Sequence, residues 1–162
     1  MNEWRRIGMH SLHDCTQVAM LGCMFKSCGR DGGCGLRFGS SSGSGSSSIT
    51  NAGRSKSFGA TLTRCFISSC GEAGGGASLE VISGSNVQLQ RCTFALSLGD
   101  SIRVMQSSTI LMNKCCVYAA AAAAMVFGER STGQILLCQV ISAGGNGVQL
   151  TGRAICCLVY NA

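Results

Sequence analysis

The stretch NVQLQRCTF, residues 86–94, recurs twice further along the chain. The sequence reads TILMNKCCV at 109–117 and TGQILLCQV at 132–140, so each copy starts 23 residues after the one before it. In all three copies an apolar residue stands three positions before a cysteine, and another stands two positions after it. A repeat of fixed period indicates an architecture built from stacked, equivalent units.

The same pattern occurs twice before residue 86, and a second apolar block follows every copy. The earlier copies are VAMLGCMF at 18–25 and ATLTRCFI at 60–67. The second blocks are LRF at 36–38, LEV at 79–81, IRV at 102–104, MVF at 125–127 and VQL at 148–150. Alternation with a period of two favours strands, and the Gly/Ser-rich segments between them favour turns. We therefore predict an all-β, single-stranded parallel solenoid of about five coils of about 23 residues.

Stacking the coils in register converts the pattern into columns of equivalent residues. The predicted inward columns are Met20, Leu62, Leu89, Met112 and Ile135; Phe25, Ile67, Phe94, Val117 and Val140; and Phe38, Val81, Val104, Phe127 and Leu150. The cysteines form a fourth column, Cys23, Cys65, Cys92, Cys115 and Cys138. Because a free cysteine is small, apolar and easily buried, we interpret this column as structural thiols at a strand bend.

The repeats SNVQLQRCTF (85–94) and SSTILMNKCCV (107–117) resemble the right-handed parallel β-helix of the pectin-lyase-like superfamily. The resemblance is to right-handed β-helix regions of the kind found in carbohydrate-binding and sugar-hydrolase proteins, and it covers nearly the whole chain. Cysteine stands here where those repeats often carry an asparagine ladder. The resemblance implies a right-handed coil, but this fold hosts enzymes and binding modules alike.

The pattern also suggests how the chain is organised. We predict an N-terminal arm or partial coil at 1–14 and a β-helix domain at 15–162, with a Gly/Ser-rich loop insertion at 39–59. The final stretch, RAICCLVYNA (153–162), begins another coil and stops. Open solenoid ends expose strand edges, so we expect self-association or further coils to cover them.

Acidic residues are too few and too scattered for polysaccharide cleavage. Enzymes of the resembling superfamily use clustered acids, whereas only Glu80 among the seven acids here is expected in a strand. With no two acids expected on neighbouring strands, paired-carboxylate hydrolysis and calcium binding lack their parts, and we predict no catalytic residue. Arg103 is expected to form a surface ion pair with Glu80 that contributes little.

The cysteines and histidines of the N-terminal region lack the spacing of a known metal site. The N-terminal region contains no CxxC pair, so we predict no metal and no cofactor for the group His10, His13, Cys15, Cys23, Cys28 and Cys34. In the vicinal pairs Cys115–Cys116 and Cys156–Cys157, the outward members are predicted to be reactive thiols: Cys116 and one member of the second pair.

The composition of the chain limits which partners and which cellular location are expected. The net charge is +6, but the basic residues are scattered, so a nucleic-acid partner is not expected. The longest apolar run, residues 115–128, is too short to cross a bilayer, and we predict no membrane span. A chain rich in cysteine without a secretory signal favours a cytoplasmic location with reduced thiols.

Three basic residues stand directly before column cysteines and should stack on one outer face. We call Arg64, Arg91 and Lys114 the basic ridge. The side-chain amides expected beside it are those of Asn86, Gln88, Gln90 and Asn113. The ridge is either ordinary solvated surface or a docking stripe for an acidic glycan or a protein.

Two functions from different classes follow. The absent acids favour a non-catalytic β-helix module for protein or glycan interaction or scaffolding, possibly as a fragment of a longer solenoid. The alternative is a degenerate or incomplete carbohydrate-active protein of lyase or hydrolase type.

Overall fold

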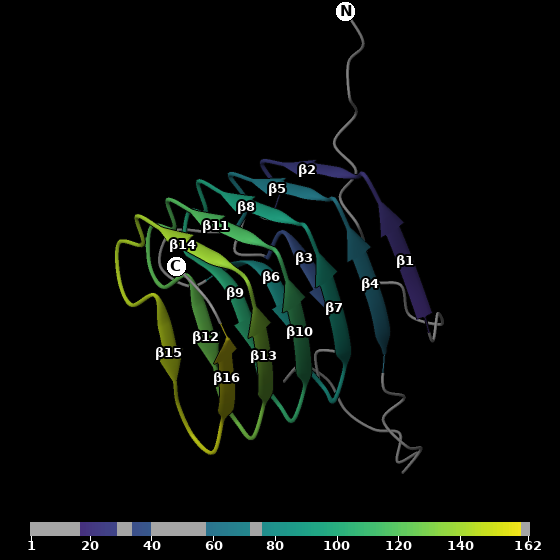
Figure 1. Cartoon of the computed structure of the whole chain (residues 1–162), viewed down its shortest axis with the longest axis vertical. Coiled ribbons are helices and arrows are strands. Elements are labelled where there is room, and N and C mark those ends of the chain that lie inside the picture. Colours follow the sequence, from purple (N-terminus) through teal and green to yellow (C-terminus); the bar gives the residue numbers. More distant parts are fainter. Residues whose placement is uncertain (1–16, 29–33, 40–57, 72–75, 160–162) are drawn as a thin grey trace, which may run out of the picture.

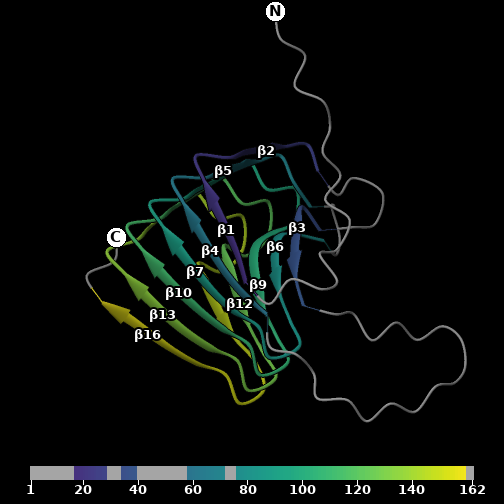
Figure 2. The same cartoon turned by 90° about the vertical axis from the view of Figure 1, so that its right-hand side faces the viewer.

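The computed structural model describes residues 17–28, 34–39, 58–71 and 76–159. These residues form three parallel sheets that wind around one apolar core (Figures 1 and 2). The predicted arm at 1–14, nearly all of the predicted insertion at 39–59, and the residues His10, His13 and Cys15 lie outside the described residues.

Every complete coil contributes one strand to each sheet, in the order A, B, C. Sheet A contains β1 (Gln17–Leu21), β4 (Gly59–Thr63), β7 (Asn86–Gln90), β10 (Thr109–Asn113), β13 (Thr132–Leu136) and β16 (Ile155–Val159). Sheet B contains β2 (Met24–Lys26), β5 (Phe66–Ser68), β8 (Thr93–Ala95), β11 (Cys116–Tyr118) and β14 (Gln139–Ile141). Sheet C contains β3 (Leu36–Phe38), β6 (Ala77–Val81), β9 (Asp100–Val104), β12 (Met125–Phe127) and β15 (Val148–Leu150).

The predicted parallel solenoid and its register are confirmed. Asn86 of β7 pairs with Thr109 of β10, which pairs with Thr132 of β13, and these offsets are the 23-residue period of the sequence. No helix occurs in the described part of the chain, although residues 119–124 are six consecutive alanines, the strongest helix former. Ala120, Ala123 and Ala124 are buried where the chain crosses from β11 to β12, so tertiary packing overrides the helical propensity.

The predicted inward columns form the core through the middle coils. Leu62, Met112 and Phe127 are completely buried, for example. At the ends the prediction is less good, because Phe25 and Val140 are only half-buried. Leu150 keeps its place in the inward column beside Phe127 but is 51 % exposed. Its column ends there among the described residues, and no later strand covers it.

The corners explain why a cysteine recurs with every coil. At the corner between sheets A and B the chain passes through a left-handed residue, with φ between +53° and +63°, at Gly22, Arg64, Arg91, Lys114 and Leu137. The following residue is always the column cysteine, and its side chain fills the tight inner side of the bend. Cys65, Cys92, Cys115 and Cys138 are at most 2 % exposed, as a small apolar side chain at this place should be.

Candidate functional site

The structure brings the three residues of the basic ridge together on consecutive coils. The backbone N–H of Arg64 donates to the carbonyl of Gln90, that of Arg91 to Asn113, and that of Lys114 to Leu136, at 2.9–3.0 Å. All three basic residues are exposed. Neighbouring strands lie about 4.8 Å apart, so the ridge presents one positive charge per coil over three coils.

The backbone beneath the ridge is uniform. Arg64, Arg91 and Lys114 all adopt φ of +53° to +54°, a conformation that costs most residues other than Gly, Asn and Asp about 1–2 kcal/mol. The same position is Gly22 at one end of the column and Leu137 at the other, so the charged part is bounded on both sides. The ridge therefore stands on a repeated, hydrogen-bonded corner rather than on a loop of variable shape.

No acidic partner neutralises the ridge within the part of the chain that the structure describes. The ion pairs found there involve Arg37, Glu80, Asp100 and Arg103, which belong to sheet C. Like charges on adjacent strands repel one another, and a bound anion that bridges them would relieve that repulsion.

The predicted amides are only partly available beside the ridge. Asn86, Gln88 and Gln90 are exposed on β7, the strand that ends directly before Arg91. Asn113 on β10 pairs with Gln90 and is half-buried. Its Oδ1 atom is shielded from solvent and accepts no hydrogen bond within the described chain, so this amide is less accessible than the sequence suggested. Gln88 and Gln90 remain the best-placed hydrogen-bonding side chains.

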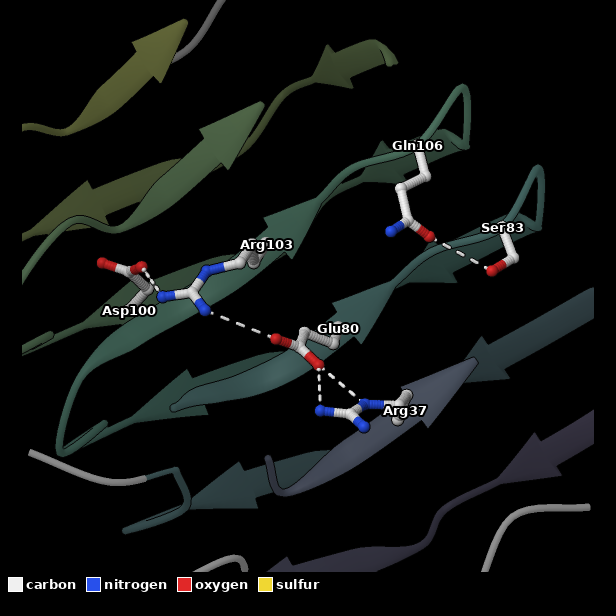
Figure 3. A network of polar contacts seen from close by, with 6 residues as sticks. All are labelled: Arg37, Glu80, Ser83, Asp100, Arg103 and Gln106. Atoms are coloured by element: carbon white, nitrogen blue, oxygen red, sulfur yellow. Dashed lines mark hydrogen bonds and ion pairs between the residues drawn. The ribbon is translucent and has the colours of Figure 1, made fainter. Parts of the chain in front are cut away.

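A second polar cluster lies on sheet C and contains more ion pairs than the single predicted pair of Arg103 and Glu80 (Figure 3). Arg37 Nη2 lies 2.7 Å from Glu80 Oε2, and Arg103 Nη1 lies 3.4 Å from Glu80 Oε1. Arg103 Nη2 also contacts Asp100 Oδ2 at 2.7 Å. The predicted pair between Arg103 and Glu80 is confirmed, but Glu80 is only 9 % exposed, so its interpretation as a surface pair was wrong.

The expectation that no two acids stand on neighbouring strands was also wrong. Asp100 is the first residue of β9, not a corner residue, and Glu80 lies on the adjacent strand β6. Asp100 additionally accepts a hydrogen bond from the Ala123 backbone N–H at 3.1 Å. Since guanidinium groups bind both carboxylates, the cluster fastens three coils together and leaves neither carboxylate free for acid–base chemistry.

Sequence reasoning missed Arg37 as a member of this cluster, although the signal was present. The middle residues of the blocks LRF, LEV and IRV are Arg37, Glu80 and Arg103, which stack in register. Cys34, near the same cluster, is half-buried, and burial, followed by the charge of Glu80, raises the pKa of its thiol.

The cysteine column is a chain of buried thiol hydrogen bonds. The thiol of Cys92 donates to the Leu62 carbonyl at 3.3 Å, and the thiol of Cys115 donates to the Leu89 carbonyl at 3.5 Å. Hydrogen bonding to Cys138 and Cys92, together with burial, raises the pKa of Cys115. The same contacts with Cys115 lower the pKa of Cys92 and Cys138 to about 7.

The corner between sheets B and C carries a second small-residue column that sequence reasoning missed. It lies five residues after each column cysteine and comprises Cys28, Cys70, Ser97, Ala120 and Ala143. The Cys28 backbone N–H donates to Cys70 Sγ at 3.4 Å, and burial raises the pKa of Cys70 to about 11.

No group of three or more His, Cys, Asp or Glu residues placed to hold a metal ion occurs within the described ranges.

Thiol reactivity should separate the outward cysteines from the column. Cys157 is exposed and Cys116 is half-buried, whereas Cys92 and Cys115 are buried. We expect a soluble alkylating reagent to modify Cys157 first and the half-buried thiols, Cys116 among them, next, and to reach the buried column thiols Cys65, Cys92, Cys115 and Cys138 only on unfolding. Peptide mass spectrometry after timed alkylation measures this order, with the variant Cys157→Ser as the control. Modification of Cys92 as fast as that of Cys157 would contradict the assigned inward column.

Comparison with known proteins adds the family. A family model described as "right handed beta helix region" matches residues 11–162. Neither the curated proteins nor the solved structures contain a match. No helix among the described residues is long and apolar enough to cross a membrane.

Proposed function

The chain belongs to the right-handed β-helix region family, and from that premise we propose that it is a non-catalytic binding module whose basic ridge holds an acidic glycan. The observation that carries the proposal is the ridge itself. Arg64, Arg91 and Lys114 are exposed on three consecutive coils, and none has an ion-pair partner in the described chain. Charges repeated at a regular spacing suit a ligand whose own charges repeat.

The surroundings of the ridge support a saccharide in particular. The exposed amides of Gln88 and Gln90 lie on the strand that leads into Arg91, and they can both donate and accept hydrogen bonds. Thr61 on β4 is exposed and pairs in register with Gln88. Such a flat face of amides and hydroxyls, with cations at its edge, offers an anionic sugar partners for both its hydroxyl and its charged groups.

A non-catalytic role accords with the state of the acids. Of the three acids in the described residues, Glu80 and Asp100 are bound by guanidinium groups on sheet C, and Glu129 alone makes no ion pair. The alternative, a carbohydrate-active protein, usually requires a pair of carboxyl groups free to act on the substrate. Incubation of the protein with polygalacturonate should therefore leave the polymer length unchanged, and shortening of the polymer would favour the alternative.

The test removes the ridge charges without disturbing the corner. We expect the variant Arg64→Asn/Arg91→Asn/Lys114→Asn to fold normally, since asparagine tolerates positive φ well. Its affinity for a heparin-derived octasaccharide should fall by about 10- to 150-fold, because three exposed charge contacts contribute roughly 0.5–1 kcal/mol each. Titration calorimetry at low and moderate salt measures the loss, and the wild-type affinity should weaken as salt rises.

A matched variant controls for net charge. Lys26→Asn/Arg130→Asn/Arg153→Asn also lowers the net charge from +6 to +3, removing three exposed basic residues outside the ridge. Arg130 even shares the left-handed conformation of the ridge residues, with φ of +64°. We expect this variant to keep most of the affinity. An equal loss of affinity in both variants would show that the ridge acts only as ordinary surface charge. Absence of octasaccharide binding by the wild-type protein would refute the proposal.

A further inference from the structure

The two ends of the solenoid differ in how well they close the core. At the N-terminal end two of the three inward columns begin with buried residues, Met20 at 8 % and Phe38 at 3 % exposure, and the third begins with the half-buried Phe25. At the C-terminal end the last residues of those same columns are open, with Leu158 at 54 % and Leu150 at 51 %. The apolar side chains Met125, Ile135 and Val148 line a hollow of about 180 Å³ beside Leu158.

Sheet A protrudes at this open end. It has six strands where sheets B and C have five, and β16 is its last strand (Figure 2). One side of β16 pairs with β13, and in the described structure no strand pairs with the other. All five residues of β16, ICCLV, are apolar, and Arg153 is the one charged residue between 137 and 159. Natural edge strands are usually guarded by charge, proline or a bulge, and β16 carries none of these.

The sequence of β16 suits pairing with a copy of itself. Antiparallel pairing centred on Cys157 sets Ile155 opposite Val159 of the other copy and Cys156 opposite Leu158. The inward residues Cys156 and Leu158 then continue the core row, while the outward residues meet outward residues. Since β16 carries no charge, this arrangement opposes no like charges.

We propose that two copies of the chain associate through their β16 edges about a two-fold axis at Cys157. Sheet A then runs without a break through both copies, and each Leu158 is covered by the other copy. Head-to-tail association is disfavoured, because Met20 and Phe38 at the N-terminal end of the described structure are buried and do not match the open Leu158 and Leu150. The contact is therefore closed, and assembly stops at two copies.

Sedimentation equilibrium over a wide range of protein concentration tests the association. We expect a reversible monomer–dimer equilibrium for the wild-type chain. Leu158→Lys should raise the dimer dissociation constant at least about a hundredfold, because it sets an ammonium group into the contact. Leu158 is half-exposed in the single copy, so the thermal midpoint measured on the monomer should change little. The control Leu21→Lys alters a 74 % exposed leucine on β1, the strand at the other end, and should leave the equilibrium unchanged.

Oxidation tests the register. Cα atoms opposite one another in antiparallel strands lie about 4.5 or 5.5 Å apart, within the disulfide range. Treatment with a dipyridyl disulfide should join the two Cys157 residues. Their thiols give up two protons and two electrons, and the reagent leaves as two thiopyridone molecules. Cys157→Ser should abolish the covalent dimer yet keep the reversible one.

Three results would overturn the proposal. They are a wild-type chain that stays monomeric at every concentration, equal dissociation by Leu21→Lys and Leu158→Lys, and a covalent dimer that persists in Cys157→Ser. The first would leave the open end to a further coil or another protein, the second would indicate a head-to-tail contact, and the third would exclude the register centred on Cys157.

Discussion

Replacing Phe94 with alanine is expected to lower the free energy of unfolding by about 3–5 kcal/mol. Phe94 is completely buried in β8, between Ile67 of β5 and Val117 of β11. Removal of its ring takes away buried apolar contacts and leaves a cavity that a stack of in-register coils cannot easily close. Urea denaturation followed by far-ultraviolet circular dichroism measures the loss as a lower midpoint.

A matched substitution on β5, the neighbour of β8 in sheet B, distinguishes the two faces of that sheet. Phe66 begins β5, pairs with Thr93 and is 37 % exposed, so its side chain lies outside the core. We expect Phe66→Ala to cost about 1 kcal/mol or less. Equal costs for the two alanine variants would mean that the inward and outward faces are wrongly assigned, and with them the register of every coil.

Replacing Glu80 with alanine should cost about 2–4 kcal/mol, far more than loss of a surface ion pair. Glu80 lies between two guanidinium groups, with Arg37 on one side and Arg103 on the other. Without the carboxylate these two positive charges face one another across a partly buried gap. The cost stays below that of a fully buried pair, because the side chains of Arg37 and Arg103 are 39 % and 25 % exposed.

The control for this prediction is Glu129, an exposed acid at the corner between sheets C and A. Glu129 is exposed and makes no ion pair in the described chain, so Glu129→Ala should change the free energy of unfolding by no more than about 0.5 kcal/mol. Both variants lose one negative charge. A similar small effect for Glu80→Ala in urea denaturation would show that the sheet C cluster contributes no more than isolated surface charges.

The period of the sequence was enough to predict most of the fold. A cysteine every 23 residues with apolar neighbours at fixed offsets determines which residues stack, and the observed pairing of Asn86, Thr109 and Thr132 follows from it. The same pattern cannot distinguish a covered coil from an end coil, because Leu150 occupies the same place in its block as Phe127. Exposure at the end depends on the next coil, which the local pattern does not contain.

The two polar sites differ in how far the sequence predicts them. The ridge could be predicted because its three residues directly precede column cysteines, so their register follows from the period. The sheet C cluster was only half predicted. Arg37 lies in a coil whose spacing is altered by turn insertions, and Asp100 was assigned to a corner because no apolar pattern marks the first residue of a strand. Outward positions carry no hydrophobic signal, so their contacts emerge only when the strands are placed side by side.

The basic ridge is proposed to bind anions as one column, and a binding footprint tests this most directly. Titration of the ¹⁵N-labelled protein with a heparin-derived octasaccharide should perturb the backbone amides of Arg64, Arg91 and Lys114 together, with those of Gln88 and Gln90. The amides of exposed basic residues outside the ridge, such as Lys26, Arg130 and Arg153, should stay in place. Perturbations centred on Arg130 and Arg153, or spread evenly over all exposed basic residues, would contradict the account.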